Sequence, residues 1–232
     1  MEPADFQAEA QPLAGTPHRY SRGERIADAA VHALGAAGGL VACGMLAAVA
    51  LPGAGADPLR ALSLLVYAAG LVAMLGCSAL YNLTPDTAPR KAALRRLDRA
   101  AIFAMIAGTY TPFGGIALGG AVGGGLLVFV WAAAAVGMAH ALRGRPGGRE
   151  RTAVLLYLLL GWCGVVLLGP LSAALPAGVL VLLAAGGVLY SVGTLPHLAT
   201  WLPYHNAAWH VCVLGGAACH FAAVLRVAAP AA

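Results

Sequence analysis

Charged side chains are almost absent from the second half of this chain. Between Ala100 and Arg226 they occur only in one short stretch, residues 143–151. A water-soluble domain carries charge on roughly a quarter of its residues, whereas this 232-residue chain is 10% charged and 60% hydrophobic. Lipid is therefore the solvent for most of the chain, and its function has to follow from the few polar groups that lie inside the membrane.

The apolar segments are long enough to cross a bilayer. A helix needs about 20 apolar residues to span a hydrocarbon core roughly 30 Å thick. Breaks at proline, glycine and charge clusters predict seven such helices, so the predicted fold class is an all-α, seven-transmembrane helix bundle. The predicted spans are residues 29–51, 61–83, 100–118, 122–142, 152–169, 177–195 and 206–227.

The distribution of basic residues tests this count. With seven spans, 12 of the 14 Lys and Arg residues share one side of the membrane, and only Arg60 and Arg226 lie on the other. Basic residues favour the cytoplasmic side, so we predict a cytoplasmic N-terminus and an external C-terminus. The net charge of +5 then reflects topology and attraction to anionic lipid head groups.

The remaining organisation is simple. Residues 1–22 lack apolar periodicity and are predicted to form a disordered tail, with no cleavable signal peptide. Residues 23–228 are predicted to form a single membrane domain. Membrane lipids are the expected partners. Nucleic acid is not expected, because the basic loops are short and carry no stacking aromatic residues, and no protein partner is indicated.

A set of polar residues lies at one predicted depth, at the cytoplasmic ends of four spans. In three of these ends the spacing is four residues, which places the side chains on one helical face about 6 Å apart along the axis. Polar groups in spanning helices usually face the bundle interior, so we expect a shared polar cavity there. The residues are Glu24, Asp28, His32, Ser78, Asn82, Asp98, Asn206 and His210.

Helix capping is the alternative explanation for part of this set. Glu24 and Asp28 would stabilise the first turn of a helix through its dipole, and Asp98 or Asn206 would serve as an N-cap. The two histidines lie about one turn or more inside apolar sequence, where packing or ligand binding would explain them. It is the convergence in depth that favours a functional site.

Six stretches of the chain match one family pattern in order. They resemble the bacterial hemolysin III family, which is related to the progestin and adipoQ receptors and more distantly to the alkaline ceramidases. The resemblance covers residues 24–225 and implies a seven-helix bundle in a bacterial inner membrane, with a cytoplasmic N-terminus. The stretches are ERIADAAVHALG (24–35), SALYN (78–82), RRLDRAAIFAMIAGTYTPF (95–113), YLLLGW (157–162), GGVLYSVG (186–193) and NAAWHVCVLGGAACHF (206–221).

The resemblance also implies a zinc site near the cytoplasmic face. Its pattern is S-x-x-x-H in helix two, an Asp opening helix three and H-x-x-x-H in helix seven. The matching positions here are Ser78, Asn82, Asp98, Asn206 and His210. In that scheme the histidines hold the metal, while Ser78 and Asp98 position a metal-bound water and are the candidate catalytic residues.

This chain departs from the pattern, because two of the three expected histidines are asparagine and an amide oxygen is a poor zinc ligand. His32 lies at a compatible depth to replace a lost ligand, whereas His205 would reach the site only if helix seven unwinds at its start. The candidate metal ligands are therefore His210, Asn82, Asn206 and His32. The alternative is a hydrogen-bonded polar site without metal.

Three hypotheses for function follow. The first is a hemolysin III-type protein that acts in membrane and lipid homeostasis with a degenerate metal site, to which the family name adds cytolytic activity. The second is a zinc-dependent intramembrane hydrolase of lipid amides, similar to ceramidases, with Asp98 as general base and Ser78 as orienting donor. The third is a receptor for a lipid signal. The asparagine pair favours the first, and a physiological pore is not expected, since an ion pathway needs continuous polar rings.

Overall fold

The computed structural model describes residues 20–51, 57–144 and 150–228. Within these ranges the structure is helical and contains no strand. A π-helical segment, Phe113–Leu118, continues α3, and a 3-10 segment, Cys163–Leu167, joins α5 to α6. The α-helices are α1 (Arg22–Ala50), α2 (Pro58–Leu83), α3 (Lys91–Pro112), α4 (Gly120–Arg143), α5 (Glu150–Trp162), α6 (Leu168–Ala174), α7 (Ala177–Leu198) and α8 (His205–Ala228).

Seven helical units in the described chain are long and apolar enough to span a membrane. Two of them are composite: α3 forms one unit with its π-helical extension, and α5 and α6 form one unit across the 3-10 segment. The predicted all-α bundle of seven spans is confirmed. Residues 1–19 of the predicted tail lie outside the described residues.

Two helices begin seven or more residues earlier than hydropathy predicts. α1 begins at Arg22 rather than Ala29, and Ser21 and Glu24 form a capping box at its start. α3 begins at Lys91 rather than Ala100, so Asp98 lies inside a helix and does not cap one. Hydropathy marks only the part of a helix that lipid surrounds, whereas backbone hydrogen bonding continues through the polar residues that precede it.

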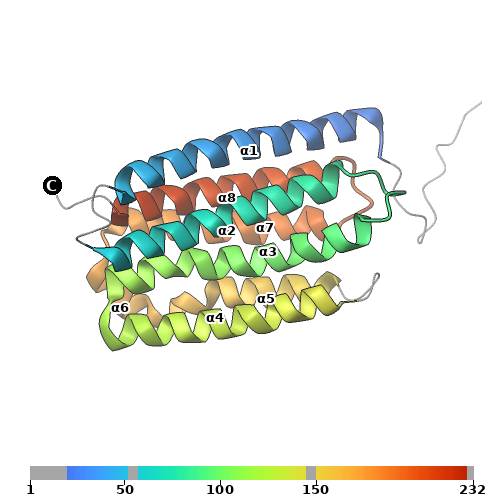
Figure 1. Ribbon diagram of the computed structural model, residues 1–232. Helices are drawn as coiled ribbons and strands as arrows, with labels where there is room; N and C mark the ends of the chain where they lie inside the picture. The colour runs from blue at the N-terminus through green and yellow to red at the C-terminus, as the bar shows by residue number, and fades with distance from the viewer. Residues whose placement is uncertain (1–19, 52–56, 145–149, 229–232) are drawn as a thin grey trace, which may run out of the picture.

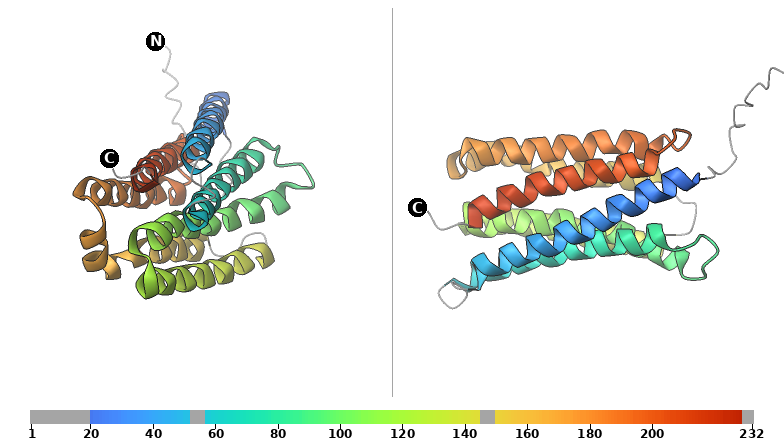
Figure 2. Two further views of the ribbon diagram at one scale, coloured as in Figure 1. Left: turned by 60° about the vertical axis from the view of Figure 1, so that its left-hand side comes forward. Right: turned by 90° about the horizontal axis from the view of Figure 1, so that it is seen from above.

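The helices run up and down through the bundle (Figure 1). α1 packs on both α2 and α8, α7 packs along α8, and α2 and α4 flank α3. Seen from above, α1 lies in front of α2 and α8 (Figure 2, right). The N-terminal ends of α1, α3 and α8 and the C-terminal ends of α2 and α7 therefore meet at one end of the bundle, which we call the polar end.

Small residues bring helices α2 and α3 close together. A Cβ atom added at Gly70 would lie 3.3 Å from the Cα of Met105, and one added at Gly108 would lie 3.3 Å from the carbonyl oxygen of Val66. In lipid, where apolar burial gives little driving force between helices, such backbone proximity supplies the packing energy. It fixes α3, and with it Asp98, against the end of α2.

The opposite end of the bundle is filled by apolar side chains, and we call it the apolar end. Leu46, Leu64, Val179 and Val224 are at most 2% exposed and belong to one continuous core. Arg60 hydrogen-bonds the carbonyl oxygen of Ala228 at the end of α8, which satisfies an acceptor that the helix leaves open. This end is closed by packing.

The fifth span is broken where it meets Tyr110 of α3. The Tyr110 hydroxyl donates to the carbonyl oxygen of Gly161 at 2.7 Å and accepts from the amide of Gly164 at 2.9 Å. Backbone groups freed inside a membrane need such partners, so one side chain stabilises the break. The break shapes the wall of a cavity described below.

Candidate functional site

The structure gathers polar residues of three helices at the polar end. Asp28 and His32 come from α1, Ser78 and Asn82 from the last turns of α2, and Asn206 and His210 from the start of α8. The spacing of four residues in each helix places both members of a pair on the inner face. The residues that the sequence places at one depth are therefore close to one another in the structure.

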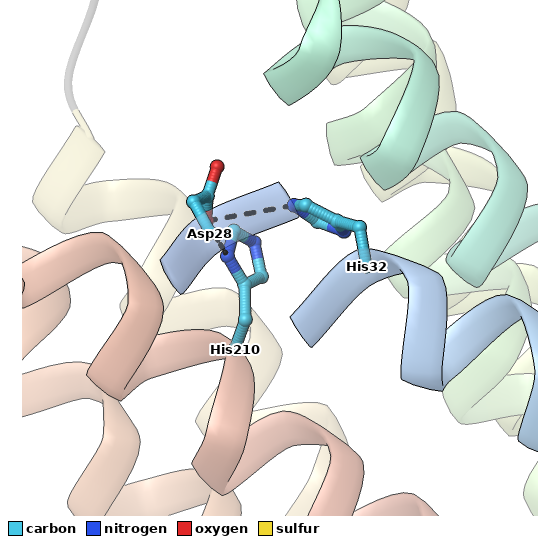
Figure 3. A group of neighbouring side chains, drawn as sticks. All are labelled: Asp28, His32 and His210. Atoms are coloured by element: carbon cyan, nitrogen blue, oxygen red, sulfur yellow. Dashed lines mark hydrogen bonds and ion pairs between the residues drawn. The ribbon is translucent and has the colours of Figure 1, made fainter. Parts of the chain in front are cut away.

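Asp28 is the centre of this group (Figure 3). Its Oδ1 atom lies 3.1 Å from Nδ1 of His210 and 3.6 Å from Nε2 of His32. The same oxygen accepts a hydrogen bond of 3.0 Å from the side-chain amide of Asn206. The two imidazole rings lie beside each other, with centroids 4.4 Å apart. One carboxylate thus joins α1 to α8.

The two asparagines hold each other and the carboxylate. Nδ2 of Asn206 donates to Oδ1 of Asn82 at 3.1 Å as well as to Asp28. Nδ2 of Asn82 in turn donates to the carbonyl oxygen of Ser78 at 2.9 Å. These hydrogen bonds link α8 to α1 and to α2.

A small cavity of about 60 Å³ lies beside the group, and Ser78, Asp98, His32 and His210 contribute to its lining. The Ser78 hydroxyl lies 3.3 Å from Nε2 of His210 and neighbours the Asp98 carboxyl group. A cavity of this size has room for more than one water molecule. The candidate catalytic residues from the sequence therefore face a space that a polar group can enter.

Several alternative roles are settled by these contacts. Glu24 does act as a cap: its side chain accepts from the Ser21 amide at 2.7 Å, and also from the Tyr204 amide at 2.9 Å. Asn206 is the second residue of α8 and its amide faces Asp28, so capping does not explain it. α8 is not unwound at its start, and His205 lies 3.3 Å from the Tyr20 hydroxyl.

The zinc ligands implied by the resemblance do not fit this arrangement. Asn82 and Asn206 use their amide groups on each other and on Asp28, and an amide is a poor zinc ligand in any case. Asp28, His32 and His210 do form a compact group, with one ligand atom from each lying within 4.8 Å of the others. Asp28 was not among the ligands predicted from the sequence. Its spacing of four from His32 was the signal that could have identified it.

A second, larger cavity adjoins the first. It has a volume of about 240 Å³ and an almost wholly apolar lining from α3, α5, α7 and neighbouring segments. Met74, Ile102, Tyr190 and Trp209 line both cavities. The polar group therefore lies at one end of a longer internal space.

Fold and site together define a class: a multi-pass membrane protein with a buried polar centre at one end of a seven-helix bundle. The family described as haemolysin-III related matches residues 24–221. The chain belongs to this family, which confirms the resemblance seen in the motifs.

Two bacterial relatives are similar over shorter stretches. The hemolysin-3 homolog of Bacillus subtilis (strain 168) is 38% identical over 159 residues, covering 67% of this chain and 71% of the relative. Hemolysin-3 of Bacillus cereus is 40% identical over 136 residues, covering 59% of this chain and 62% of the relative. In both cases less than three quarters of the relative's length is matched.

Proposed function

We propose that this protein binds a single-chain lipid of the bacterial inner membrane inside its bundle and acts in membrane lipid homeostasis. The observation that carries the proposal is the pair of adjoining cavities, one apolar and one polar, which share Met74, Ile102, Tyr190 and Trp209. An acyl chain fits the apolar part, and its polar end then lies at Ser78 and His210.

The volumes suit such a ligand. A dry cavity of about 150 Å³ accommodates benzene, and pockets for drug-sized ligands begin near 300 Å³. The apolar cavity of about 240 Å³ falls between these values, which favours a thin alkyl chain over a bulky ligand. The polar cavity of about 60 Å³ leaves room for a small head group or for water.

The wall of the apolar cavity includes residues that face outward. Val165 and Leu168, at the break in the fifth span, line the cavity and are 56% and 55% exposed on the protein surface. In a membrane, that surface is covered by lipid. Entry from the bilayer beside this break is therefore the route that we infer for the ligand.

The test is mass spectrometry of lipids retained by the detergent-purified protein. Ile102→Trp should fill the junction of the cavities and reduce the retained lipid by tenfold or more. Val128→Trp is the matched control, because Val128 is 73% exposed on α4 and lines neither cavity. Equal retention by both variants, or no single-chain lipid on the unmodified protein, would contradict the proposal.

Hydrolysis of a lipid amide is the second candidate function. It is favoured by the grouping of Ser78, His210 and Asp98 around the polar cavity. Ser78 would donate a hydrogen bond to the substrate carbonyl, and Asp98 would accept a proton from water. A divalent metal bound nearby would polarise a carbonyl and make water more acidic.

This second function predicts cleavage of N-acyl lipids by the purified protein. Asp98→Asn should abolish the cleavage while leaving the amount of retained lipid unchanged, because Asp98 does not line the apolar cavity. Failure to cleave any member of a broad lipid-amide panel would leave lipid binding as the function.

Cytolysis, which the name of the Bacillus cereus relative, hemolysin-3, denotes, is a weaker candidate for this chain. The site's polar side chains gather at the polar end, and the apolar end is closed by residues such as Leu46 and Leu64. A conducting path needs polar groups along its length. Release of a dye from vesicles that contain the purified protein would test for lysis, and none is expected.

A further inference from the structure

We propose that Asp28 and His32 from α1, together with His210 from α8, form a zinc site. This ligand set shares only His210 with the set implied by the resemblance, and two of its three ligands come from a different helix. The inference does not depend on a bound lipid, because metal binding is measured on the protein alone.

The first observation is the geometry of the three side chains. A tetrahedral zinc ion with ligands at about 2.0–2.2 Å holds them about 3.3–3.6 Å apart. Oδ1 of Asp28 lies 3.1 Å from Nδ1 of His210 and 3.6 Å from Nε2 of His32. Figure 3 shows both rings turned toward this carboxylate. The ligand atoms of all three side chains lie within 4.8 Å of one another, so binding one ion would also bring the two histidine nitrogens together.

The second observation concerns His32. Its side chain is only 6% exposed, and its Nε2 atom has no hydrogen-bond partner among the described residues. A buried polar atom without a partner costs free energy. The atom faces Asp28 at a separation too long for a hydrogen bond. A shared cation would satisfy both groups.

The surroundings orient the ligands as metal sites usually do. A metal-bound histidine normally uses its second nitrogen for a hydrogen bond that fixes the ring. Here Nε2 of His210 lies 3.3 Å from the Ser78 hydroxyl, which leaves Nδ1 facing Asp28. The amide of Asn206 holds the Asp28 carboxylate in the same way. Asn206 therefore orients a proposed ligand without being one itself, and Asn82 in turn holds Asn206.

Charge also suits a divalent cation. Asp98 lines the polar cavity, and Asp28 lies 3.1 Å from His210, which lines the same cavity. Carboxylates buried in a membrane need a compensating charge. Two imidazoles and a carboxylate form a ligand set typical of catalytic zinc. Both histidines also line the cavity that Ser78 and Asp98 line.

The experiment is zinc titration of the chelator-washed, detergent-purified protein by calorimetry, with metal content measured by elemental analysis. We expect about one zinc per chain, and a loss of affinity of about 100-fold or more in Asp28→Asn, His32→Ala and His210→Ala. Asp57→Asn is the matched control, because Asp57 is an exposed acidic residue that caps α2 at the apolar end. It should bind zinc as the unmodified protein does.

A spectroscopic readout separates ligand loss from misfolding. Cobalt in the same site should give the visible absorption of a tetrahedral ion, and this band should disappear in Asp28→Asn while the circular dichroism of the helices stays unchanged. Two results would overturn the proposal. One is no stoichiometric zinc on the unmodified protein. The other is full zinc binding in Asp28→Asn and His32→Ala with loss in Asn82→Ala, which would return the site to the ligand set implied by the family.

Discussion

The two ends of the bundle solve the same packing problem with opposite chemistry. At the apolar end, helices meet through side chains such as Leu46, Leu64 and Val224, which are almost fully buried. At the polar end, α1, α2 and α8 meet through one carboxylate, amides and imidazoles. Apolar contacts of this kind tolerate small adjustments, whereas the polar contacts require particular atoms. The comparison leads us to expect that stability resides mainly at the apolar end, and it agrees with the ligand binding that we propose for the polar end.

The largest effect is expected from truncating the core of the apolar end. Leu64→Ala removes a side chain that is 1% exposed and should lower the free energy of unfolding by about 2–5 kcal/mol. Leu65→Ala is the control, because Leu65 is 58% exposed toward lipid and its truncation should cost within about 0.5 kcal/mol. Unfolding by denaturing detergent measures both. Equal losses would break the assignment of stability to this core.

A glycine pair on α4 gives a second test at the apolar end. A Cβ atom at Gly123 would collide with the carbonyl oxygen of Gly114, whereas one at Gly124 would meet nothing within 4 Å. Gly123→Ala should therefore destabilise the protein by about 1–3 kcal/mol, while Gly124→Ala should be neutral or stabilising by up to about 1 kcal/mol. The same unfolding measurement applies. If Gly123→Ala leaves stability unchanged, the backbone at Gly114 can move to accommodate the added Cβ atom.

At the polar end, a small loss of stability should accompany a large loss of binding. Asn206→Ala removes the hydrogen bonds to Asp28 and Asn82 and should cost about 0.5–1.5 kcal/mol in unfolding. Zinc affinity should fall by about 10- to 100-fold, because the carboxylate loses its orienting partner. Ser172→Ala, which removes an exposed hydroxyl bonded to Gly169, is the control. Unchanged zinc affinity in Asn206→Ala would show that the amide does not orient the ligand.

The smallest expected effect is on the pH dependence of stability, and it concerns Tyr20, two residues before α1. Burial, and then the negative charge of Asp28, raise the pKa of Tyr20 to about 12. Because the folded-state pKa lies above the ordinary value of about 10, the contribution of Tyr20 to stability is complete below pH 10 and is lost as pH rises toward 12. Tyr20→Phe should therefore reduce the fall in stability between pH 10 and 12. An identical fall in both proteins would contradict this role.

The sequence determined the number of spans and the end at which the polar residues gather. Seven apolar segments interrupted by charge or proline are a property of local composition, because each must match the thickness of the bilayer by itself. The spacing of four between Ser78 and Asn82, and between Asn206 and His210, fixed which helical face they share. The cytoplasmic position of the N-terminus remains a prediction from the basic residues.

Tertiary structure alone decided which of the polar residues touch. From the sequence, Asp28 was equally explained as a residue of the first turn, because the start of α1 at Arg22 was not visible in hydropathy. Its role depends on a contact with His210, 182 residues away, which the packing of α1 on α8 brings about. The same packing turns Asn82 and Asn206 toward each other. Depth along a helix follows from composition, but rotation toward a particular neighbour depends on how all seven spans pack, and that rotation makes the site.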